Sequence, residues 1–207
     1  MSRYVSEFLA LKCAPDVLGT VGFLGHKPEK EITEAMAIIR KLKRIALNDP
    51  NKYQLIDLCS GNALVPVIAA HLLPFTKTYA VDKLKRVRNW GHAKRFEYIS
   101  SQIEHMPLSL FARPSVITAV HCCRGAAETI IDIFNMVPTI RHMILMPCCI
   151  GSLNSGLLQF IKNEANRDVA WVTKLSVMCD SAVHISRDNH VLSPKNYIIT
   201  ASKKEKI

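Results

Sequence analysis

The stretch YQLIDLCSGNALVPVIAAHLLPFTKTYAVDK, residues 53–83, decides the fold because two apolar runs flank a short polar loop and a helical segment. Residues 53–58 predict a buried strand, residues 63–73 a helix and residues 77–82 a second strand. A strand, a helix and a second parallel strand form the unit from which α/β sheets are built.

The rest of the chain continues this alternation. Strands that are apolar on both faces are typical of a parallel sheet covered by helices. We therefore predict an α/β fold with a mostly parallel seven-stranded sheet, helices on both faces and an antiparallel pair of strands at the C-terminal edge. Helices are expected over 29–48, 126–137 and 156–166, a helix or helical turn over 85–95, and further strands over 96–103, 115–123, 142–149, 171–178 and 196–203.

Length and composition favour one compact unit. The chain has 207 residues, of which 49% are hydrophobic, which is enough for one sizeable core. We expect an N-terminal extension and helix over residues 1–48, followed by the main domain over residues 49–207.

Charge and cysteine usage point to a partner and a compartment. The 27 Lys and Arg residues exceed the 17 Asp and Glu residues by 10, which favours a polyanionic partner such as RNA. Seven cysteines, an odd number with two adjacent pairs, indicate a reducing compartment; we expect the cytoplasm, and the nucleus fits as well. No apolar run is long enough for a membrane span, so no membrane partner is expected.

In an open parallel sheet, ligands bind at the carboxyl ends of the strands, where two acids stand in this sequence. Asp82, at the end of the second strand, is placed to accept hydrogen bonds from ribose hydroxyls, while Asp57 orients the loop or holds a cationic group. Most positions of a G-x-G-x-x-G dinucleotide fingerprint are vacant, so a cofactor without phosphates fits better than a dinucleotide. The small residues that let such a cofactor approach the backbone are Cys59, Ser60, Gly61 and Asn62.

The segment DLCSGNA followed by VDK resembles the first two motifs of class I S-adenosylmethionine (SAM) methyltransferases. Cys59 and Ala63 stand where two of the usual loop glycines would be. Further on, HCCRGAAETIIDI, LMPCCIG and SPKNYIITASK are similar to the tRNA acceptor-stem 2′-O-methyltransferases and the methyltransferase-like proteins related to them. The likeness covers residues 53–202 and implies a Rossmann-like class I methyltransferase fold that binds SAM.

The resemblance implies a set of site residues. The cofactor would contact Asp57, Cys59, Ser60, Gly61, Asn62, Asp82, Lys83, Gln102, Ile103 and His121, with Gln102 at the adenine edge and Ile103 against its face. The catalytic candidates are His121, Cys122, Arg124 and Cys148. If the acceptor is a ribose hydroxyl, we expect His121 to act as general base and Arg124 to hold phosphate. If the acceptor is a nitrogen, no base is required and His121 orients the substrate.

Three interpretations are open for the cysteines at the ends of the fourth and fifth strands. Adjacent cysteines do not easily turn both sulfurs inward, so we expect no metal site. Cys148, which follows a proline, has the chemistry of a nucleophile toward a pyrimidine ring. The third interpretation, small apolar residues packed around the pocket, is the commonest fate of buried thiols.

A basic cluster follows the second acid directly. Long basic side chains beside an aromatic residue suit a phosphate backbone and an unstacked base. The predicted RNA-binding residues are Lys85, Arg86, Arg88, Trp90, Lys94 and Arg95. We therefore expect a SAM-dependent RNA methyltransferase active in tRNA processing. Methylation of a protein or small molecule, and a non-catalytic binding module with the same fold, remain alternatives.

Overall fold

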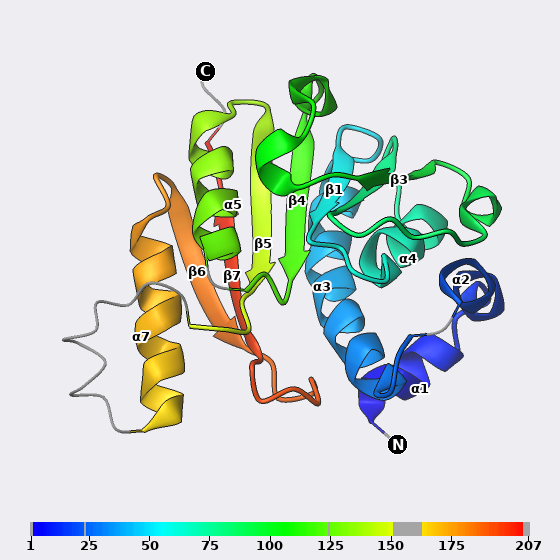
Figure 1. Cartoon of the computed structure of the whole chain (residues 1–207), viewed down its shortest axis with the longest axis horizontal. Coiled ribbons are helices and arrows are strands. Elements are labelled where there is room, and N and C mark those ends of the chain that lie inside the picture. The colour runs from blue at the N-terminus through cyan, green and yellow to red at the C-terminus, as the bar shows by residue number, and fades with distance from the viewer. Residues whose placement is uncertain (1, 23, 124, 151–162, 205–207) are drawn as a thin grey trace.

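The computed structural model describes residues 2–22, 24–123, 125–150 and 163–204. Its centre is a seven-stranded sheet in the order β3-β2-β1-β4-β5-β7-β6 (Figure 1). The first five strands pair in parallel, and β7 runs antiparallel to both β5 and β6. The strands are β1 Gln54–Leu58, β2 Thr78–Asp82, β3 Phe96–Ser100, β4 Ser115–Val120, β5 Ile140–Met146, β6 Ala182–Arg187 and β7 Tyr197–Ser202.

Helices cover both faces of the sheet, so the predicted fold class is confirmed. Figure 1 shows α5 and α7 in front of β5, β6 and β7, while α3 and α4 lie beside β1. The helices are α1 Arg3–Leu9, α2 Ala14–Val21, α3 Pro28–Asn48, α4 Leu64–Leu72, α5 Gly125–Met136 and α7 Glu164–Val177, with 3₁₀ turns η1 Trp90–His92, η2 Ile103–His105 and η3 Leu108–Phe111.

Alternation along the strands divides the core in two. Leu55 and Val116 pack with the helices α1 to α4 on one face, whereas Ile56 and Ile117 pack with α5 and α7 on the other. Successive side chains of a strand point to opposite faces, which explains why these strands are apolar throughout. The N-terminal helix α1 shares the first core with α3 and α4.

One predicted element is wrong. Residues 171–178, expected as a strand, lie within or just after α7, and the sixth strand is β6, in a segment that we expected to be a loop. Trp171, Val172 and Leu175 are buried against the sheet at helical spacing, so packing overrides the strand propensity of tryptophan and valine. The segment 85–95 contains only the single turn η1. Most of the helix expected over 156–166 lies outside the described residues.

The order of the strands determines where a ligand can bind. The chain moves from β1 outward through β2 to β3, and then crosses back to place β4 on the other side of β1. The connections therefore diverge between β1 and β4, which leaves a crevice at their carboxyl ends. Asp57 of β1 lies next to Thr118 of β4 in the register of this pair.

Candidate functional site

Two cavities open at the carboxyl ends of the strands, on either side of the loop from β1 to α4. The larger, of about 550 Å³, is lined by Asp82, Gln102, Ile103 and Cys123 among others. The smaller, of about 350 Å³, is lined by residues of the α3 N-terminus and by Asp57. Four residues border both cavities: Cys59, Gly61, Arg86 and His121.

All ten predicted cofactor residues line one or both cavities. Asp57, Ser60 and Asn62 line the smaller one, while Asp82, Lys83, Gln102 and Ile103 line the larger one. Cys59, Gly61 and His121 are shared. The topology thus brings together residues that are as far as 64 positions apart in the chain, from Asp57 to His121.

The loop from β1 to α4 retains a backbone that glycine normally provides. Cys59, Gly61 and Ala63 have φ angles of 54°, 53° and 61°, in the left-handed region. Residues with a Cβ atom rarely adopt this region, because Cβ crowds the following carbonyl oxygen. The loop therefore turns as tightly as a glycine-rich one, although the thiol of Cys59 borders both cavities.

Asp57 holds the loop from β1 to α4 through hydrogen bonds of its side chain. Its two carboxylate oxygens accept hydrogen bonds from the Ser60 hydroxyl (2.5 Å) and the Thr118 hydroxyl (2.6 Å). Burial raises the pKa of Asp57 from 3.8 to about 7, and the two hydrogen bonds, which lower the pKa, offset only part of that rise. Asp57 therefore ties the loop to β4.

Asp82 holds the other side of the loop. Its Oδ2 accepts a hydrogen bond from the Gly61 backbone N–H (2.8 Å) and its Oδ1 one from the Leu84 N–H (2.9 Å). Each carboxylate oxygen can accept more than one hydrogen bond, so acceptor capacity is left toward the larger cavity. Ile103 supplies an apolar wall there, and Gln102 supplies an exposed amide.

His121 and Glu34 form a pair that the sequence did not indicate. The Nε2 atom of His121 lies 2.5 Å from Oε1 of Glu34, which is 2% exposed. Lys30 lies 3.4 Å from the same Nε2 and 3.2 Å from Oε1. The distance between His121 and Glu34 is short for an ion pair, although its angles are not those of an aligned hydrogen bond.

The short contact between His121 and Glu34 suits one tautomer of the ring. A lone pair on Nε2 would face the Glu34 carboxylate at 2.5 Å, whereas a proton on Nε2 would face an acceptor. A neutral ring with its proton on Nε2 has its lone pair at Nδ1. His121 also has a left-handed backbone, with φ of 57°, a strain that is typical of functional sites.

Glu34 was not predicted as a site residue because α3 is buried on several sides. The apolar spacing of Ile32, Met36 and Ile39 defines one face, and Glu34 lies off that face. In the structure every residue from 32 to 39 is buried, since α1 packs against α3 in addition to the helix's packing on the sheet side. An acid inside an otherwise apolar run of this helix was the available signal.

A second network connects α3, the loop and the basic segment. The Asn62 amide donates to Glu31 (2.7 Å), and Arg88 donates to the Asn62 carbonyl oxygen (2.8 Å). Burial raises the pKa of Glu31 and lowers the pKa of Arg88. These hydrogen bonds hold the rim of the smaller cavity and give Arg88 a positioning role in the loop.

The catalytic candidates separate in the structure. Cys122 is fully buried in the core with α5, and burial raises its pKa, so its thiol cannot reach either cavity. Burial, and hydrogen bonds with Cys123 and Cys149 that favour the protonated thiol, likewise raise the pKa of Cys148, which opposes its predicted role as a nucleophile. Among the described candidates, only His121 borders the cavities; Arg124 lies outside the described residues.

The predicted RNA-binding residues also differ from one another. The guanidinium of Arg95 donates to the backbone oxygens of Ala70 in α4 and of Phe75 just after it, which gives Arg95 a structural role. Trp90 is half-buried and stacks on Tyr98 at 4.9 Å, so its ring is already occupied on one face. Lys85 and Lys94 are exposed, and Arg86 is half-buried between the two cavities.

The fold and the crevice at its switch point define the class: a Rossmann-like α/β sheet with an antiparallel C-terminal edge, as in methyltransferases. The chain belongs to a methyltransferase domain family, whose model matches residues 27–156. No curated protein matches the sequence.

Solved structures show the same fold at low sequence identity. The methyltransferase domain of bacterial CtHen1 has a TM-score of 0.57 at 13% identity, covering 84% of this chain and 100% of that one. The METTL16 methyltransferase domain has a TM-score of 0.53 at 10% identity, covering 87% of this chain and 69% of that one. The antibiotic-resistance methyltransferase Kmr has a TM-score of 0.51 at 11% identity, covering 78% of this chain and 91% of that one. Within the described part of the chain, no helix is long and apolar enough to cross a membrane.

Proposed function

We propose that the protein binds SAM in the larger cavity and transfers its methyl group to RNA, with a ribose 2′-hydroxyl as acceptor. The observation that carries the proposal is the meeting of Asp82, the β1–α4 loop and Ile103 around one cavity. Carboxylate acceptors suit ribose hydroxyls and an apolar wall suits adenine, so the residues present fit this cofactor. When bound, SAM supplies an electrophilic methyl group on sulfur.

Different residues of the chain would contact different parts of SAM. Asp82 would accept from the ribose hydroxyls, while Ile103 would contact the adenine face and Gln102 its edge. The tight backbone at Cys59 and Gly61 lets the ligand approach the loop closely. His121 borders both cavities and would therefore stand where donor and acceptor meet.

His121 would act as general base. A ribose hydroxyl needs help with deprotonation near neutral pH, whereas an amine does not. With a proton on Nε2 facing the Glu34 carboxylate, Nδ1 would accept the hydroxyl proton. The carboxylate also stabilises the imidazolium that this transfer creates, by the logic of a carboxylate–histidine pair.

RNA as the substrate is supported by charge beside the larger cavity. Lys83 and Lys85 are exposed just after β2, and Lys83 also lines the larger cavity. Leu84 and Val87, on the same segment, are 51% and 88% exposed. Exposed cations beside exposed apolar side chains suit a phosphate backbone and an unstacked base.

The experiment is calorimetric titration with SAM and with S-adenosylhomocysteine, compared between the natural protein, Asp82→Ala and the control Asp132→Ala. Asp132 is exposed on α5, away from the residues lining both cavities. We expect micromolar binding that is lost only in Asp82→Ala, followed by uptake of labelled methyl groups into RNA. Folded protein that binds neither ligand would contradict the proposal and favour a non-catalytic binding module. Methyl uptake into protein instead of RNA would contradict the substrate assignment alone.

A further inference from the structure

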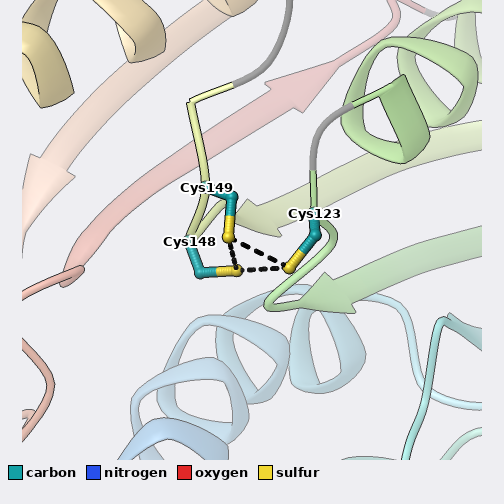
Figure 2. Close-up of side chains that lie close together, drawn as sticks. All are labelled: Cys123, Cys148 and Cys149. Carbon is teal, nitrogen blue, oxygen red and sulfur yellow. Dashed lines mark hydrogen bonds between the residues drawn. The ribbon is translucent and has the colours of Figure 1, made fainter.

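Three cysteines meet at the ends of β4 and β5, beside the larger cavity but outside the set of residues proposed to bind SAM (Figure 2). The sulfur of Cys123 lies 2.8 Å from that of Cys148 and 3.3 Å from that of Cys149. The sulfurs of Cys148 and Cys149 are 3.4 Å apart. Figure 2 shows all three pointing toward one another.

This convergence corrects an expectation drawn from the sequence. Adjacent cysteines in an extended strand would point to opposite faces. Cys148 and Cys149, however, follow the last residue of β5, where the chain bends, and both turn toward the loop after β4. The spacing argument against a metal site therefore does not apply to this pair.

The distances fit neither a disulfide nor three isolated thiols. A disulfide needs sulfurs about 2.05 Å apart, so no covalent bond joins them. All three sulfurs lie within 4.8 Å of one another, so one cation among them can contact every sulfur at once. Thiolate is a ligand that soft divalent metal ions prefer, which makes the cluster a candidate site for a metal ion.

We propose that Cys123, Cys148 and Cys149 bind a thiophilic divalent cation, with Zn²⁺ as the ion of choice. Each thiol loses its proton to solvent as its sulfur coordinates the ion, and water completes a tetrahedral set. A Zn–S bond of about 2.3 Å requires sulfurs about 3.8 Å apart. Cys123 and Cys149 are exposed, so small rotations of their side chains can open the cluster to that size.

The site joins the turns after β4 and β5 next to His121. The thiols of Cys123 and Cys148 both donate to the backbone oxygen of His121, at 3.3 and 3.5 Å. The backbone N–H of His121 in turn donates to Met146 of β5 (2.8 Å). Bound Zn²⁺ would thus hold the strained backbone of His121 in place. This positioning role rests on the proposed function, whereas metal binding itself does not.

The test measures metal directly on reduced protein. We would determine zinc content after purification and then titrate metal-free protein with Zn²⁺ and with Co²⁺, whose thiolate complexes absorb in the near ultraviolet. The variants are Cys123→Ser and Cys148→Ser, with Cys13→Ser as a matched control, because Cys13 is a half-buried cysteine before α2. We expect one equivalent of metal in the natural protein and the control. Affinity should fall about 100-fold or more in either cluster variant, since even outer-shell partners contribute about 10-fold to 100-fold.

Two results would overturn the site: no metal bound by the reduced protein, or equal binding by the cluster variants. A third would replace it: if reduced protein left in air loses two reactive thiols without binding Co²⁺, the cluster is a disulfide pair. Cys123→Ser changes an exposed side chain and serves as the folded variant should Cys148→Ser unfold. Metal binding without SAM binding would contradict the proposed function and support the metal site. SAM binding without metal binding would support the proposed function and contradict the metal site.

Discussion

At the scale of single residues, the close approach of Glu34 to His121 gives the sharpest prediction. We expect Glu34→Gln to lower turnover by about 10²-fold to 10⁴-fold, the range for removal of a positioned base, because an amide cannot fix the tautomer of His121 or stabilise its cation. SAM affinity should change little. Glu29→Gln is the control, since Glu29 is exposed on the same helix. Turnover within twofold of the natural protein would rule out the assigned role of Glu34 in positioning His121.

Asp57 predicts a pH dependence of stability. Its pKa is raised from 3.8 in the unfolded chain to about 7 in the fold, so the folded state favours the protonated carboxyl. The resulting stability is fully present below pH 4 and is lost as the pH rises through 7, by up to about 4 kcal/mol.

Asp57→Asn should remove this dependence of stability on pH. Chemical denaturation of Asp57→Asn and of the natural protein at pH 5 and at pH 8 measures it, with the exposed Asp132→Asn as control. The free energy of unfolding of the variant, relative to that of the natural protein, should be higher at pH 8 than at pH 5. Parallel pH profiles for the two proteins would show that Asp57 stays ionised in the fold.

At the scale of elements, α7 is a helix formed by a segment whose local propensity favours a strand. Trp171 and Leu175 are buried against the sheet, while Val169 of the same helix is 45% exposed. We expect Trp171→Ala to lower the free energy of unfolding by about 3–5 kcal/mol. Val169→Ala, the matched control, should stay within about 0.5 kcal/mol. Urea unfolding followed by circular dichroism measures both, and equal decreases would mean that α7 does not pack as described.

The parallel strands around the two cavities were predictable from the sequence, whereas the strands at the C-terminal edge were less predictable. Strands β1, β2, β4 and β5 are short apolar runs between polar turns, so period and length agree. Strand β6 alternates partly buried Val183 and Ile185 with exposed residues, a weaker signal that polar neighbours obscure. Asp82 was predictable because a strand end fixes its place, whereas Glu34 depends on how α1 packs on α3.

At the scale of the whole molecule, the positive charge predicts salt-dependent RNA binding. We expect the combined change of Lys83, Lys85 and Lys94 to alanine to weaken binding and to reduce the salt slope by up to about 0.7 for each phosphate that a lysine no longer neutralises. The control changes Lys12, Lys43 and Lys204, which are also exposed but lie outside the basic segment 83–95. Filter binding of single-stranded RNA at several salt concentrations measures both. Equal slopes in the two triple variants would indicate that RNA binds by net charge alone.

The left-handed backbone at Cys59 and Ala63 bears on which residues this loop tolerates. The dihedral angles hold at two residues that carry a Cβ atom, while Asp57 and Asp82 tie the loop from both sides. Because the two acids fix the turn, the loop keeps the shape of a glycine-rich one at a small cost in strain. The acids and the dihedral angles therefore characterise this turn better than a count of its glycines.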